Sequence, residues 1–165
     1  MTSYTAWNSA MPTTAARAGV TTGTAIKTML QIATPSTNKI RVLKWGVRFE
    51  SAPTAIVRCE LVTTGSVAAT VTAHVAAGVQ PYGDSQVPAS LMTLGTSATG
   101  YTASAEGTVT TTRTGDEWIA PIGVSYYDYE WSLGREWEVP ISTFLRVRMT
   151  TATAVVAQTY IIWDE

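Results

Sequence analysis

The stretch Asn38-Lys39-Ile40-Arg41-Val42-Leu43-Lys44-Trp45-Gly46-Val47-Arg48-Phe49-Glu50 decides the fold of this 165-residue chain. From position 43 to position 49 every odd-numbered residue is large and apolar, whereas upstream the even-numbered Ile40 and Val42 are the apolar pair. Successive side chains of a strand point to opposite faces, so a strand cannot reverse its apolar parity without an extra residue. The sequence therefore predicts a long strand, half buried and half in water, with a β-bulge or bend at Val42–Leu43.

Other segments of the chain also alternate between apolar and polar residues, and short turn sequences separate them. In 144–150 we expect Leu145, Val147 and Met149 to point inward and Arg146 and Arg148 outward. The segment 154–163 is apolar on both parities, which predicts a central strand. By spacing, 26–32, the long strand and 56–62 predict an antiparallel meander. The remaining expected strands are 107–113, 118–124 and 126–131.

The composition favours the same fold class, because Thr, Ser and Gly supply much of the polarity and only 14% of residues are charged. About eight short strands without a helical period predict an all-β protein, an antiparallel β-sandwich that is jelly-roll-like. We expect residues 24–165 to form this single domain. The Ala- and Thr-rich segment 63–107 should contain short strands or a brief helix and pack on a neighbour.

Residues 1–23 are small and polar, and they predict an extended N-terminal arm. Such an arm is usually disordered in water unless something holds it. We expect a neighbouring subunit to hold it, with the protein's own domain as the alternative. Trp7 is the arm residue that we expect to anchor an intersubunit contact.

Charge and cysteine content exclude several classes of protein. The net charge of −1 argues against a dedicated nucleic-acid binder. Residues 1–60 contain seven basic and two acidic residues, whereas the remainder contains four basic and ten acidic ones. This uneven charge would orient a subunit on a charged partner, unless folding mixes the two halves. The single Cys59 forms no internal disulfide and is expected to be a small buried hydrophobe. We expect no signal peptide and no membrane-spanning segment.

No motif in the sequence predicts catalysis, a cofactor or a metal site. His74 is the only histidine and lies in an Ala-rich segment without a nearby carboxylate, so we expect a structural role. Asp128 and Glu130 should share one strand face and point into solvent. A glycosidase site instead needs one carboxylate on each side of the bond that is cleaved. The six tryptophans suit either a glycan-stacking face or a core and subunit interface; Trp45 and Trp163 lie on parities that favour the core.

Several segments resemble the head proteins of tailed bacteriophages that infect actinobacteria, from about Gln31 to the C-terminus and without the arm. These segments are Gln31-Ile32-Ala33-Thr34-Pro35-Ser36, Lys44-Trp45-Gly46-Val47-Arg48-Phe49, Thr72-Ala73-His74-Val75, the run from Gly95 to Gly107, Leu133-Gly134-Arg135-Glu136 and Trp163-Asp164-Glu165. The resemblance implies a capsid decoration (cement) protein with a jelly-roll-like sandwich, located on the virion exterior and without catalytic residues. It also implies that the partner is the major capsid protein, and that the chain is a homo-oligomer, with a trimer favoured.

On this interpretation the chain bridges subunits of the major capsid protein and thereby stabilises the shell. The residues expected to contact the capsid or a neighbouring subunit are Tyr4, Trp7, Arg17, Arg41, Lys44 and Arg48. The alternative is a receptor- or glycan-binding β-sandwich module on a virion or tail, in which Trp118, Tyr127, Tyr129 and Trp131 would line a groove.

Overall fold

In the computed structural model, which describes residues 2–84 and 86–165, the longest strand is β4 (Ile40–Phe49), and it bulges where the apolar parity reverses. β4 pairs antiparallel with β13 (Val156–Asp164); Ile162 lies opposite Lys44 and Trp163 opposite Val42, so Leu43 is the unpaired extra residue. Val42 and Trp45 are consequently both buried on the core side, although two residues separate them. The predicted bulge is confirmed.

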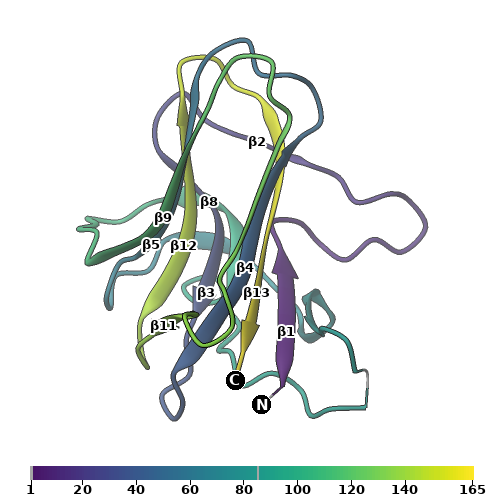
Figure 1. Ribbon diagram of the computed structural model, residues 1–165, viewed down its shortest axis with the longest axis vertical. Helices are drawn as coiled ribbons and strands as arrows, with labels where there is room; N and C mark the ends of the chain where they lie inside the picture. The colour runs from purple at the N-terminus through teal and green to yellow at the C-terminus, as the bar shows by residue number, and fades with distance from the viewer. Residues whose placement is uncertain (1, 85) are drawn as a thin grey trace.

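The strands form two antiparallel sheets that pack face to face as a β-sandwich (Figure 1), which confirms the predicted all-β sandwich. The seven-stranded sheet has the order β10 (Tyr126–Glu130), β4, β13, β1 (Ser3–Trp7) and β7 (Val79–Pro81), with β11 (Trp137–Val139) also pairing with β4 and β2 (Val20–Thr21) with β13. The six-stranded sheet has the order β6 (Thr70–Ala73), β8 (Gly100–Ala105), β3 (Lys27–Ala33), β12 (Phe144–Thr151), β5 (Val57–Thr63) and β9 (Arg113–Ala120).

The core lies between the two sheets and contains the inward-facing residues of both. Trp45 and Trp163 are fully buried there, as predicted, opposite aliphatic residues such as Leu145 and Met149 from β12. Cys59 is also fully buried, and burial raises the pKa of its thiol to about 12, so it behaves as the expected small hydrophobe. The described residues of the segment 63–107 include β6, β7, β8 and a 3-10 turn, η1 (Ala76–Gly78), which fits the expected short strands or brief helix.

Two predictions about strand arrangement are wrong. The predicted meander does not form, because β3 and β5 lie in the six-stranded sheet while β4 between them lies in the seven-stranded sheet. The connections before and after β4 therefore cross from one sheet to the other instead of making hairpins. The predicted Thr-rich strand over 107–113 is also absent, since β9 begins only at Arg113; the preceding residues run over the six-stranded sheet as irregular chain.

The expectation that residues 1–23 form an arm is wrong for its first part. Residues 3–7 form β1, which lies between β13 and β7 inside the seven-stranded sheet. Tyr4 and Ala6 point into the core and are 3% and 0% exposed, so the chain's own domain holds this strand. The loop over residues 8–19 projects from the side of the sandwich before β2 returns to pair with β13 (Figure 1).

Arg146 ties two irregular segments onto the outer face of the six-stranded sheet. As predicted, Arg146 points away from the core, but its side chain is fully buried rather than in solvent. Its Nη1 donates to the backbone carbonyl of Glu106 at 3.3 Å and to the Glu106 carboxylate at 3.4 Å, and its Nη2 donates to the carbonyl of Val67. The same carboxylate accepts hydrogen bonds from the amide and hydroxyl of Thr28, each at 2.5 Å. Burial lowers the pKa of the Arg146 guanidinium to about 10.

Removing Arg146 should destabilise the fold far more than removing a surface arginine. Arg146→Ala leaves the carbonyls of Val67 and Glu106 without this donor and removes the cation paired with the Glu106 carboxylate. We expect a loss of about 3–5 kcal/mol in the free energy of unfolding. Arg58→Ala is the matched control, because the Arg58–Glu117 pair has half-exposed side chains and should lose less than about 1 kcal/mol. Urea denaturation followed by tryptophan fluorescence measures both values. Equal losses in the two variants would contradict the structural role of Arg146.

Candidate interaction surface

The outer face of the seven-stranded sheet carries a shallow depression of about 210 Å³. Strand alternation brings most of its lining outward from three adjacent strands, β1, β4 and β13, and Tyr82 adds to it from just after β7. We call this surface the Trp7 face and define it by the lining residues together with the neighbouring Arg17. The lining residues are Thr5, Trp7, Lys44, Arg48, Tyr82, Tyr160 and Ile162.

Tyr160 forms the floor of the depression because Gly46 leaves room for its ring. Gly46 on β4 lies opposite Tyr160 of β13 on one side and opposite Asp128 of β10 on the other. A Cβ at position 46 would overlap both side chains. Across this gap the Tyr160 hydroxyl donates a hydrogen bond of 2.6 Å to Oδ1 of Asp128. Burial raises the pKa of the Tyr160 phenol, and the Asp128 carboxylate raises it further. The side chain is only 4% exposed, so Tyr160 supports the surface rather than contacting solvent itself.

Trp7 lies over this floor and is in contact with two guanidinium groups. Its ring centroid is 4.7 Å from that of Tyr160. The Cζ of Arg17 lies 4.7 Å from the Trp7 ring centroid and the Cζ of Arg48 lies 5.6 Å from it, distances at which cation–π attraction operates. Arg17 comes from the projecting loop, where its Nη1 donates to the hydroxyl of Ser9 at 3.3 Å.

The charge of the Trp7 face is positive and largely uncompensated. Neither Arg17 nor Arg48 forms an ion pair with a carboxylate in the part of the chain that the structure describes. Lys44 is 4.0 Å from the carboxylate of Glu130, the limit of an ion pair, and the Glu130 side chain is largely exposed. An anionic group approaching the depression would therefore meet two cations that no internal partner neutralises.

The structure brings together four of the six residues that the sequence proposed for contact: Trp7, Arg17, Lys44 and Arg48. Tyr4 is not among them, because it points into the core and its hydroxyl donates to the carbonyl of Pro88 at 2.8 Å. Arg41 also lies elsewhere, in a cluster where its Nε is 3.6 Å from the carboxylate of Glu138.

Sequence reasoning missed Tyr160, Gly46 and Asp128, which shape the surface. Gly46 carried a usable signal, since a glycine inside a strand often marks a close approach of another group. Asp128 and Glu130 do share one face, as predicted, and that face is the outer side of the sheet. Asp128 accepts the Tyr160 hydrogen bond there, and neither carboxylate faces a second one across a cleft.

His74 holds the backbone of Trp7 from inside the protein. Its Nε2 donates to the carbonyl of Trp7 at 2.8 Å, and its ring is 4.8 Å from the ring of Tyr101. The side chain is 4% exposed, and burial lowers the pKa of His74, with the positive charge of Arg17 acting in the same direction. His74 is thus in the structural position that the sequence predicted, as a neutral donor under β1.

The four aromatic residues proposed to line a glycan groove form a wall at the side of the sandwich. Trp118 stacks on Tyr127 at a centroid distance of 4.9 Å, and the Tyr127 hydroxyl donates to Asp116 at 2.7 Å. Trp118, Tyr127 and Trp131 are half-buried and pack against the core, while Tyr129 is 40% exposed. This arrangement closes the sandwich between β9 and β10 and offers few exposed ring faces for a sugar.

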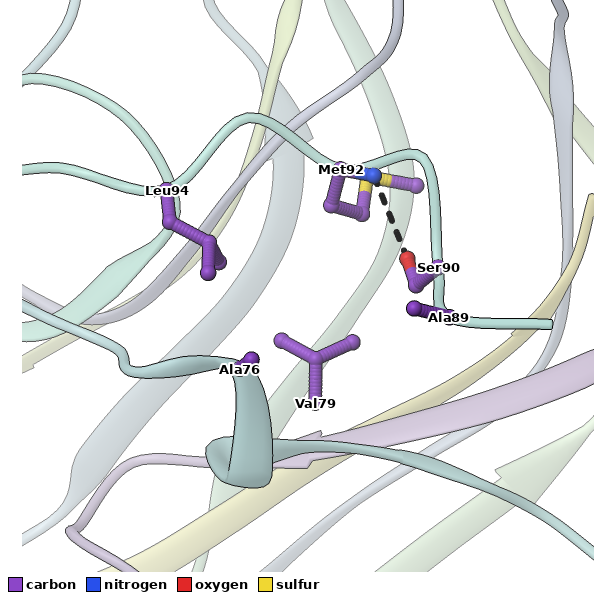
Figure 2. A pocket seen from close by; sticks show the side chains of 6 residues that line it. All are labelled: Ala76, Val79, Ala89, Ser90, Met92 and Leu94. Carbon is purple, nitrogen blue, oxygen red and sulfur yellow. Dashed lines mark hydrogen bonds between the residues drawn. The ribbon is translucent and has the colours of Figure 1, made fainter. Parts of the chain in front are cut away.

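A second hollow in the molecule is a small apolar pocket between η1 and the segment 89–94 (Figure 2). Its volume is about 40 Å³, little more than the volume of one water molecule. Ala76 and Val79 lie on one side and Met92 and Leu94 on the other, and the one polar contact drawn is the Met92 amide donating to the Ser90 hydroxyl at 3.2 Å. No acid, base or cation lines the pocket, so it is a packing gap rather than a site for chemistry.

Comparison of the chain with protein-family models, curated proteins and solved structures gave no significant match. Among the described residues, no three His, Cys, Asp or Glu side chains are placed to hold a metal ion. No helix in the described part is long and apolar enough to cross a membrane.

Filling the space at Gly46 should disturb the Tyr160–Asp128 contact directly. We expect Gly46→Ala to lower the free energy of unfolding by about 1–3 kcal/mol, because the new Cβ displaces both side chains. Tyr160→Phe removes only the hydroxyl and should cost about 1 kcal/mol. Since both changes disrupt the same hydrogen bond, the double variant should lose less than the sum of the single losses in urea denaturation. Strictly additive losses would show that Gly46 does not act through Tyr160.

His74 should make the protein less stable in mild acid. The folded-state pKa lies below the unfolded value of about 6.5, so the unfolded chain binds more protons between these two pH values. The stabilisation by neutral His74 is complete above pH 6.5 and is lost as the pH falls toward the folded pKa. Thermal unfolding from pH 8 to pH 5 should show this fall in the wild type and a flatter profile in His74→Gln, which keeps an N–H donor but does not titrate. Identical profiles would contradict a buried neutral histidine.

Proposed function

We propose that this chain is a structural virion protein, a decoration protein that binds the outer surface of a phage capsid and stabilises it by bridging major capsid protein subunits. The resemblance to head proteins of actinobacterial phages supports the proposal, and so does the observation that the Trp7 face gathers an indole and three cations over one depression. In this proposal the protein is not an enzyme, needs no cofactor and binds neither nucleic acid nor membrane. It acts on the capsid exterior as a homo-oligomer, with a trimer favoured.

The composition of the Trp7 face matches that of binding hot spots. Tryptophan, tyrosine and arginine are the residues most enriched among those that carry binding energy at protein interfaces. Trp7 and Arg48 are held in place by Tyr160, so little side-chain entropy remains to be lost when a partner binds. The matching surface on the major capsid protein would present carboxylates to Arg17, Lys44 and Arg48 around an apolar contact for Trp7.

The position of the Trp7 face on a broad, rigid sheet supports the bridging part of the proposal. β13 hydrogen-bonds to β4 on one side and to β1 on the other, so the face cannot change shape without breaking the ladder. The projecting loop over residues 8–19 extends this surface beyond the sandwich and carries Arg17 (Figure 1). A rigid face that continues into a loop can contact two neighbouring shell subunits at once, which resists their separation.

Charge reversal on the Trp7 face should weaken capsid binding. Purified full-length chain is added to capsids that lack it, and the bound fraction is measured by sedimentation. We expect Arg48→Glu to bind about tenfold more weakly at low salt, and the difference from wild type should shrink as salt screens the interaction. Arg135→Glu is the matched control, because it makes the same charge change in the exposed turn after β10 and should bind like wild type. Unchanged binding of Arg48→Glu would refute the docking role of this face.

A further inference from the structure

One end of the sandwich is built from three connections that contain no charged residue. These are residues 51–56 between β4 and β5, 119–125 around the end of β9, and 152–155 between β12 and β13. They lie together at the top of the molecule in Figure 1. Backbone hydrogen bonds hold them together. The Gly123 amide donates to the Pro53 carbonyl at 3.2 Å, the Phe49 amide to the Ser125 carbonyl at 2.7 Å and the Glu50 amide to the Val156 carbonyl at 3.0 Å. We call this end the uncharged tip.

Four β-branched aliphatic side chains are exposed at the uncharged tip. Ile56, Ile119, Ile122 and Val124 are 59%, 49%, 65% and 38% exposed. Ile56 and Ile119 lie close together because Val57 pairs with Ala120 and Arg58 with Ile119 where β5 meets β9. Ile122 and Val124 belong to the turn that follows β9, in which the Val124 amide donates to the Pro121 carbonyl at 3.3 Å. Single exposed apolar residues are ordinary, but a contiguous group without charges marks an interaction surface.

The uncharged tip is also rigid. Pro53 is buried, and Pro121 and the positive φ of +87° at Gly123 fix the turn that presents Ile122. The connection between β12 and β13 is tied in as well, since the amide of Val155 donates to the hydroxyl of Thr22 at 3.0 Å. A preorganised patch loses little conformational entropy on association.

We infer that the uncharged tip is the surface through which copies of this chain associate. Where identical copies meet at a rotation axis, the same patch of each copy lies around that axis, so a patch of one charge would repel itself. The Trp7 face, with Arg17, Lys44 and Arg48, has this problem, whereas the uncharged tip has no charge to repel its copy. Charged groups that flank the tip already have partners: the Glu50 carboxylate accepts the Gly19 amide at 2.7 Å, Lys27 Nζ donates to the Thr21 carbonyl at 2.7 Å, and Arg58 pairs with Glu117.

A lipid surface fits the uncharged tip less well than a second copy does. Loops that enter a membrane interface are usually supported by basic residues that attract anionic lipids. Arg58, the basic residue closest to Ile119 along the paired strands, already has the carboxylate of Glu117 as its partner. This inference rests on the part of the proposed function that makes the chain a homo-oligomer, and it does not depend on capsid binding.

Sedimentation velocity of the full-length chain over about a hundredfold range of concentration tests the inference. We expect the wild type to form a dimer or trimer and Ile122→Glu to associate at least tenfold more weakly, because the new charges face each other. Leu133→Glu is the matched control: Leu133 is 97% exposed in the turn after β10 and should associate like wild type. A monomeric wild type, including one that binds phosphatidylcholine vesicles instead, would overturn the inference. So would an Ile122→Glu variant that associates normally, or a Leu133→Glu variant that is weakened equally.

A cysteine at the uncharged tip gives a second test that does not depend on a disruptive charge. Cys59 is buried with a raised pKa, so Ile122→Cys would provide the one reactive thiol of the folded chain. Under mild oxidation we expect Ile122→Cys to give disulfide-linked pairs and Leu133→Cys to stay unlinked; no linkage at position 122 would overturn the inference. Capsid binding is measured separately. If the wild type associates with itself but does not bind capsids, the decoration role is refuted and the inference about the uncharged tip is unaffected.

Discussion

Because Leu43 is an extra residue, both halves of the ten-residue strand β4 place their apolar side chains in the core. Without the bulge, either Ile40 and Val42 or Trp45 and Val47 would face water, since the side-chain period of a strand is two. With it, all four are fully buried, and the backbone carbonyl of Leu43 is free to accept the amide of Trp131 at 2.9 Å. The bulge thus joins the end of β10 to β4 and places both halves of β4 against the same core.

The same constraint determines which residues reach the outside of the seven-stranded sheet. Once Trp45 and Val47 are fixed inward, Lys44, Gly46 and Arg48 must point outward. Gly46 then opens the space in which Tyr160 meets Asp128, and Tyr160 supports Trp7. The outer face of the six-stranded sheet differs, because buried Arg146 fastens irregular chain across it. One sheet is therefore covered on its outer side by its own chain, and the outer face of the other stays open.

Local alternation was enough to predict the bulge, the two faces of β10 and the central place of β13, because each depends on a few neighbouring residues. It could not tell to which sheet a strand belongs, so the meander of β3, β4 and β5 was wrong. β1 was missed because its large aromatic residues fall on both parities: Tyr4 faces the core with Ala6, whereas Trp7 faces outward with Thr5. Arg146 was placed on the correct face, but alternation carries no information about the segments that cover it. The Trp7 face was recognised only in part, since its floor comes from β13, far along the chain.

The scarcity of charge makes the positions of the uncompensated cations unusually informative. Lys39, Arg41, Arg58, Arg146 and Arg148 each lie within 3.6 Å of a carboxylate in the described chain, so they add little to the field outside the molecule. A net charge of −1 gives the protein little overall long-range attraction for a charged partner. Its recognition must then depend on short-range contacts, and these favour places where desolvated rings and unpaired guanidinium groups coincide. Trp7, with Arg17 and Arg48 against its ring, is such a place, whereas the uncharged tip has apolar contact alone. The first suits a partner of opposite charge, and the second suits a surface as uncharged as itself.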